Sequence, residues 1–264
     1  MASALVLVGP AAPAHAATNK IVTENALAGA PASQWDIQGA GDTTLQGFTT
    51  QLSVAPGETV DFKIDDKSVT GTTNPAPYRI DIYRLGYYGG AGARLVGSID
   101  PTGITQPVQP ACTLTDPTGA RLLDCGNWGV TASWHVPADA VSGIYIARPT
   151  RTADSTRASH IAFVVRDDAG RSDILVQTSD TTWQAYNPYG GYNAYYTANG
   201  VDGNAWKLSY NRPFTTRGGE LENWLFNAEY PMLLWLERNG YDVSYTTHID
   251  TGLHPERLLE HRTF

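Results

Sequence analysis

A change of pattern near residue 167 is the feature that most constrains what this chain can fold into. Before it, short runs rich in β-branched and aromatic residues recur between turn signals, at residues 47–54, 59–64, 78–85, 94–99, 129–136, 143–148 and 160–166. In the run 78–85 apolar and polar residues alternate, as they do in a strand with one buried face. This series of short strands predicts an antiparallel, Ig-like β-sandwich over residues 20–167.

After residue 167 the pattern becomes that of an α/β domain. The apolar run 173–177 indicates a strand covered on both faces, and residues 241–245 indicate the next strand. Between them, residues 230–239 predict a helix, with Pro231 in its first turn and Gly240 as its stop. A strand, crossover helix and strand require a parallel sheet with further strands beside them. Residues 258–264 resemble the approach to a third strand, so we expect residues 168–264 to be the first portion of a C-terminally truncated α/β domain.

The two ends of the first part carry signs of export. An apolar run at residues 2–8 and the sequence Ala14-His15-Ala16 predict a signal peptide over residues 1–16, incomplete because no Lys or Arg precedes it. A disordered Ala/Pro-rich tail is the alternative. Cys112 and Cys125 flank a turn sequence able to bring them within bridging range, which predicts a disulfide. Because oxidising compartments keep such bonds, we expect a secreted, extracellular protein.

Charge and motifs exclude several classes of function. A net charge of -8 argues against a sequence-independent nucleic-acid binder, and no run approaches the about 18 apolar residues of a membrane span. The sequence has no Gly-x-Ser-x-Gly, Walker A or His-Glu-x-x-His motif. The densest polar segment is 179–187, which follows the strand 173–177 where open parallel sheets bind ligands. Its Tyr186 could serve as an iron ligand, or it could only pack and form hydrogen bonds.

Several motifs resemble those of the N,N-dimethylformamidase large (beta) subunit-like family, and in particular its secreted actinobacterial branch. They are residues 21–25, 78–88, 142–145, 182–187, 210–213 and 227–231. The resemblance implies a β-sandwich packed on a domain similar to class I glutamine amidotransferases. It also implies hydrolysis of an amide C–N bond at one iron held by two tyrosines and a glutamate.

The resemblance also assigns candidate iron ligands. Tyr186 matches one tyrosine ligand, and Tyr145 matches the other by its Ser-Gly-Ile-Tyr motif and its distance along the chain from Tyr186. Tyr230 is the alternative second ligand. The family's glutamate and a neighbouring histidine belong to a Gly-His-Asp-Glu-Tyr-Trp-like motif that this sequence lacks. Because the coordination sphere and the general base are then incomplete, we expect this fragment to be inactive by itself.

Two functional hypotheses remain open at this point. The first is a fragment of an iron-dependent amidohydrolase that acts on a small linear amide. The second is a non-enzymatic extracellular module whose Tyr- and Trp-rich segment 183–206 contacts a carbohydrate or another polymer. Further partners would be other copies of this chain in a homo-oligomer, or a small subunit.

Overall fold

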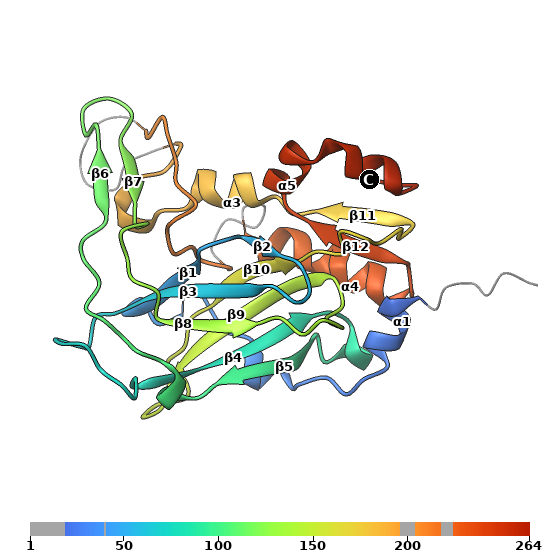
Figure 1. Cartoon of the computed structure of the whole chain (residues 1–264), viewed down its shortest axis with the longest axis horizontal. Coiled ribbons are helices and arrows are strands. Elements are labelled where there is room, and N and C mark those ends of the chain that lie inside the picture. Colours follow the sequence, from blue (N-terminus) through green and yellow to red (C-terminus); the bar gives the residue numbers. More distant parts are fainter. Residues whose placement is uncertain (1–18, 40, 196–203, 218–223) are drawn as a thin grey trace, which may run out of the picture.

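The computed structural model describes residues 19–39, 41–195, 204–217 and 224–264, so the expected signal peptide lies outside the described residues. Two sheets face each other in the first part of the chain (Figure 1). One has the order β1-β3-β8, formed by Leu45–Thr49, Thr59–Asp66 and Ala132–His135. The other has the order β2-β10-β9-β4-β5, formed by Ser53–Val54, Ile161–Val165, Gly143–Arg151, Tyr78–Leu85 and Ala93–Ile99.

Alternation along the strands places the core between these sheets. In β4, Tyr78, Ile80 and Ile82 are buried, as the sequence pattern predicts. From the facing sheet, Phe62 packs against Phe163 with ring centroids 6.1 Å apart. The neighbouring strands are antiparallel except β2, which runs parallel to β10. The protein is therefore β-rich, with several sheets and few helices, as expected.

Two features of this part differ from the sequence-based expectation. The run 47–54 is not one strand, because the chain leaves the three-stranded sheet after β1 and joins the five-stranded sheet as β2. A hairpin of β6 (Thr113–Thr115) and β7 (Leu122–Asp124) was not predicted. A disulfide between Cys112 and Cys125 closes this hairpin, which confirms the predicted pairing.

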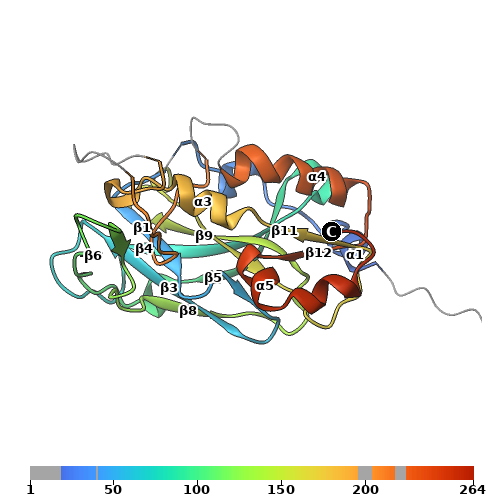
Figure 2. The same cartoon turned by 90° about the horizontal axis from the view of Figure 1, so that it is seen from above.

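The second part contains the expected strand, helix and strand. β11 (Ile174–Gln177) pairs in parallel with β12 (Val243–Thr246), and α4 (Tyr230–Arg238) connects them. Gly240 ends α4 in a left-handed conformation, with its N–H donating to the Glu237 carbonyl at 3.1 Å. Figure 2 shows α4 and α5 (His248–Leu253) on opposite sides of the strand pair. Thr263 forms a parallel bridge to Ile174 on the free edge of β11.

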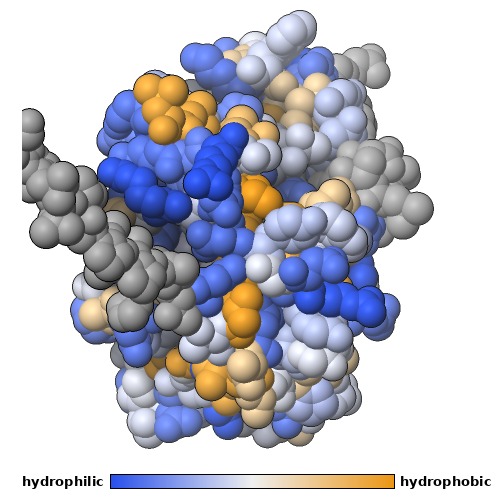
Figure 3. Space-filling model, turned by 90° about the vertical axis from the view of Figure 1, so that its right-hand side faces the viewer, coloured by the Kyte–Doolittle hydropathy of each residue, from blue (hydrophilic) through white to orange (hydrophobic). Residues whose placement is uncertain are grey.

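Shorter helices complete the described fold. α1 (Lys20–Asn25) and α2 (Ala32–Trp35) precede the sandwich, and α3 (Asp180–Tyr186) follows β11 directly. A π-helix over Leu225–Glu229 runs into α4, and 3-10 turns lie at Tyr88–Gly90, Pro101–Gly103, Tyr189–Gly191 and Pro255–Glu260. Among the described residues, no helix is long and apolar enough to cross a membrane. On the face in Figure 3, hydrophobic side chains form separate patches among hydrophilic ones.

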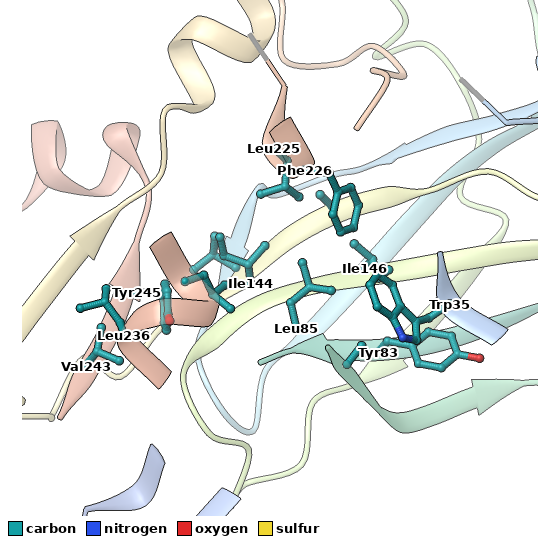
Figure 4. Close-up of a cluster of buried hydrophobic side chains, with 14 of the residues drawn as sticks. Trp35, Tyr83, Leu85, Ile144, Ile146, Leu225, Phe226, Leu236, Val243 and Tyr245 are labelled. Carbon is teal, nitrogen blue, oxygen red and sulfur yellow. The ribbon is translucent and has the colours of Figure 1, made fainter. Parts of the chain in front are cut away.

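The two parts share one hydrophobic cluster. Leu85, Ile144 and Ile146 on the outer face of the five-stranded sheet pack with Leu236 of α4 and Tyr245 of β12 (Figure 4). Since the core is continuous across residue 167, the division into domains at that point stays a prediction. This shared core holds elements from both parts in a fixed arrangement, so a site can be built from both.

Candidate functional site

A cavity of about 340 Å³ lies between the sandwich and the elements that follow the parallel strands. One wall is formed by residues 48–53 and by Ile161 and Ala162 of β10. The other is formed by Gln184 of α3, residues 210–212 and 214, and residues 247, 249 and 250 at the start of α5. Because β11 and β12 end at Gln177 and Thr246, the cavity lies at the carboxyl edge of the parallel strands, where open sheets bind ligands.

Apolar side chains form much of the cavity wall. Phe48 and Ile161 come from the sandwich, and Phe214 faces them from the loop before the π-helix. Phe214 is held in place by stacking on the buried Trp183 of α3, with ring centroids 5.4 Å apart. A few polar groups interrupt this surface, which is the usual composition of a small-molecule site.

Arg212 is the most unusual polar group of the cavity. Its side chain is buried, with 1% of the residue exposed, and its four hydrogen bonds go to neutral acceptors. These are the carbonyls of Ser209 at 3.1 Å, Tyr192 at 2.7 Å and Gln184 at 3.2 Å, and the Gln184 side chain at 3.4 Å. Burial lowers the Arg212 pKa to about 10, and Asp124 opposes the shift. The guanidinium is therefore charged at neutral pH.

Asp180 ties together the three segments that form the wall opposite the sandwich. Its carboxylate is fully buried and accepts hydrogen bonds from the Tyr210 hydroxyl at 2.8 Å and the His248 backbone N–H at 2.6 Å. A third bond comes from the Thr178 hydroxyl at 2.8 Å. Burial and the nearby carboxylate raise the pKa of Tyr210, so this phenol remains a donor. The shape of the cavity thus depends on one acidic residue at the start of α3.

Glu229 supports α3 from outside the cavity. It accepts hydrogen bonds from the Ser179 N–H at 3.1 Å and from the Trp183 indole at 2.6 Å. Burial raises the Glu229 pKa to about 7, although both hydrogen bonds oppose the shift. Glu229 does not line the cavity, so we interpret it as a structural carboxylate that positions α3.

The structure does not bring Tyr145 and Tyr186 together. Tyr145 lies in the core between the sandwich sheets, 1% exposed, and donates to the Val141 carbonyl at 2.7 Å. Burial raises its pKa, which opposes ionisation. Tyr186 is partly exposed at the end of α3, where its ring stacks on Tyr195 with centroids 4.3 Å apart. Because α3 packs through Trp183 on the outer face of the five-stranded sheet, the two tyrosines belong to opposite faces.

The resemblance implies an iron site, but the positions of Tyr145 and Tyr186 do not suit two ligands of one iron. The alternative ligand Tyr230 donates to the Gly92 carbonyl at 2.9 Å and packs against Trp35. Within the ranges that the structure describes, no group of three His, Cys, Asp or Glu side chains could hold a metal ion. Iron binding by Tyr145 and Tyr186 as a pair therefore stays a prediction that this arrangement does not support.

Sequence reasoning located the segment after β11 but missed Arg212 and the cavity. Arg212 belongs to the Tyr-Asn-Arg-Pro motif at residues 210–213, one of the motifs that carry the family resemblance. The usable signal was an arginine and a proline within a long loop without periodicity, since such loops often carry function. Its burial could not be inferred, because the covering residues come from distant segments.

Comparison with known proteins identifies a family for this chain. Among curated proteins none matches this chain. The family described as N,N-dimethylformamidase beta subunit-like, C-terminal, matches residues 79–264. This range starts within β4 and includes all residues that line the cavity except residues 48–53. The chain belongs to the N,N-dimethylformamidase beta subunit-like, C-terminal family.

Proposed function

We propose that this protein is part of a hydrolase of amide C–N bonds and that the amide binds in the cavity between the sandwich and α3. The observation that carries the proposal is family membership over residues 79–264, the range that builds most of the cavity. The family name denotes cleavage of a formamide C–N bond. A cavity with apolar walls and few polar groups suits a small linear amide with an apolar substituent.

Binding and turnover are separate parts of this proposal. The sequence lacks the Gly-His-Asp-Glu-Tyr-Trp-like motif from which the resemblance draws a glutamate and a histidine. The carboxylate that lines the cavity, Asp250, already accepts hydrogen bonds from the Thr247 N–H and hydroxyl in the cap of α5. Among the described residues, Asp250 is the one carboxylate that lines the cavity, and it serves as the cap of α5. Because the motif that would add a glutamate and a histidine is absent, we expect this chain to bind an amide without hydrolysing it.

Calorimetric titration with N-benzoylglycinamide tests the assignment of the cavity. Thr50 lies at the exposed rim, so Thr50→Trp should block entry without disturbing the core. Thr70→Trp is the matched control, because Thr70 is exposed and lies outside the cavity wall. We expect saturable binding to the wild type and to Thr70→Trp, and none to Thr50→Trp. Equal binding to all three proteins would overturn the assignment.

Turnover is followed in the same samples as release of ammonia from N-benzoylglycinamide. We expect no release above the uncatalysed rate. Ammonia release by the 264-residue chain would show that the general base lies among its own residues.

The proposal includes one candidate iron ligand. This residue lies two positions after Gln184, which lines the cavity, so we propose Tyr186 as a candidate iron ligand and assign no others. We also propose an Ig-like sandwich from the strand pattern and secretion from the signal-peptide pattern of residues 1–16. From the resemblance, we propose an amidotransferase-like second part. A disulfide between Cys112 and Cys125 is consistent with an extracellular protein.

A second candidate function is an extracellular module that binds a polymer. Trp206 is 75% exposed and Tyr195 is 59% exposed, and aromatic faces of this kind contact sugars or other polymers. Trp183, in contrast, is buried, and residues 196–203 of the same segment lie outside the described residues. Retention of the wild type on insoluble cellulose or chitin, with loss of retention in Trp206→Ala, would support this function. Passage of the wild type through both matrices would exclude them as ligands.

A further inference from the structure

We infer that the ligand of the cavity is an amide that also carries a carboxylate, and that Arg212 binds this carboxylate. The inference rests on the proposed function and narrows its substrate class. It is carried by the charges and free donors of the cavity wall, which are independent of the family match.

The charged groups around the cavity are not all paired. Arg166 is paired with Asp168 at 3.0 Å and lies 3.7 Å from Asp250, so its charge is compensated. Arg212, by contrast, has no carboxylate within ion-pair distance among the described residues. Asp124, which raises its pKa from a distance, is hydrogen-bonded to Ser209 instead. A buried, uncompensated guanidinium is costly, and a ligand anion would supply the missing partner.

The geometry of Arg212 leaves a donor for such a ligand. A guanidinium carries five N–H groups, two on each terminal nitrogen and one on Nε. Nε donates to Ser209 and Nη2 donates twice to Gln184, but Nη1 donates only to the Tyr192 carbonyl among the described residues. One N–H of Nη1 is therefore free to donate to an anion. The three anchored nitrogens hold the group in place, so binding requires little ordering of the side chain.

The rest of the cavity wall indicates the chemical class of the ligand. One uncompensated positive charge matches a monoanion such as a carboxylate better than a doubly charged phosphate. The apolar side chains of Phe48, Ile161 and Phe214 face the space beside it and suit an acyl or aryl group. A small molecule with an apolar acyl group, an amide and a carboxylate has the chemistry of an N-acyl amino acid.

Paired titrations with hippurate and N-benzoylglycinamide test the inference on the wild-type protein. The two molecules have the same skeleton, and they differ in that a carboxylate replaces a neutral terminal amide. A charge-assisted hydrogen bond in a buried site should make hippurate bind at least ~10-fold more tightly. Equal affinity for both probes would overturn the role of Arg212 and leave the cavity assignment intact. Failure of both to bind would instead overturn the proposed function.

Variants then assign the preference to one side chain. Arg212→Gln should reduce the preference for hippurate to less than about 3-fold. Arg148→Gln is the matched control, because Arg148 is also buried without an ion-pair partner among the described residues and lies outside the cavity wall. It should keep the wild-type preference. A preference that persists in Arg212→Gln would place the anion site elsewhere. If this variant does not fold, the wild-type comparison of the two probes still decides the question.

Discussion

Replacing Glu237 with glutamine should strongly destabilise the protein, because Glu237 joins the two parts of the chain. Both side chains of the Arg84–Glu237 pair are fully buried, and the two guanidinium nitrogens donate to the carboxylate at 2.8 and 3.0 Å. Asn25 and Tyr245 donate to the same carboxylate at 2.8 and 2.9 Å. Glu237 thus connects α1, the sandwich strand β4, α4 and β12.

The expected cost depends on the groups that the substitution leaves behind. In Glu237→Gln the charge of Arg84 stays buried without a counterion, and the new amide nitrogen faces donors instead of acceptors. Breaking a buried ion pair by neutralising one partner costs about 3–5 kcal/mol. With a urea dependence of about 1–3 kcal/mol per molar, the unfolding midpoint should fall by at least roughly 1 M.

A double-mutant cycle measured by urea unfolding distinguishes this explanation from a general packing defect. In an Arg84→Met background the Glu237→Gln substitution should cost much less than in the wild type, because no buried cation is left unpaired. A cost below about 1 kcal/mol in the wild-type background would refute the reasoning. So would the same cost in both backgrounds.

Three further predictions concern separate features. Because the Glu229 pKa is raised in the folded protein, folding favours the protonated carboxyl. The free energy of unfolding should therefore fall by roughly 3 kcal/mol as the pH rises from 4.5, the ordinary glutamate pKa, through about 7. Glu229→Gln should remove this pH dependence from the urea midpoint, and an unchanged profile would contradict it. Replacing both Cys112 and Cys125 with alanine should lower the free energy of unfolding by about 2–3 kcal/mol, according to the loop-closure model. Thermal unfolding without reductant measures this change, and an unchanged stability would contradict it. When ferric iron is added to the protein, we expect no tyrosinate charge-transfer band that depends on both Tyr145 and Tyr186. A band that is lost in Tyr145→Phe and also in Tyr186→Phe would show that the two phenols bind one metal.

Local patterns predicted the elements whose formation depends on neighbouring residues in the sequence. The strand 78–85 matches β4, because alternation is a property of the strand itself. The expectation of a single buried face fails in its second half, since Tyr83 and Leu85 on the other face are buried in the cluster shared with the second part. The helix 230–239 matches α4 to within one residue, since proline at its start and glycine after its end are local signals. The parallel pairing of β11 and β12 followed from the connecting helix.

The features that the sequence could not predict depend on distant contacts. The run 47–54 has one continuous pattern, yet pairing with β3 and then with β10 divides it between two sheets. Tyr145 and Tyr186 matched the resemblance by motif, but strand alternation directs Tyr145 into the sandwich core. The burial of Arg212, and its lack of an ion-pair partner among the described residues, depend on segments that are distant in the sequence.

A crystal structure of the protein with hippurate would test the central claim most directly. We expect hippurate in the cavity between the sandwich and α3, with its apolar group against Phe214. A carboxylate oxygen should lie about 2.7–2.9 Å from Nη1 of Arg212. Hippurate bound at another surface, or in the cavity with its carboxylate pointing away from Arg212, would contradict the account.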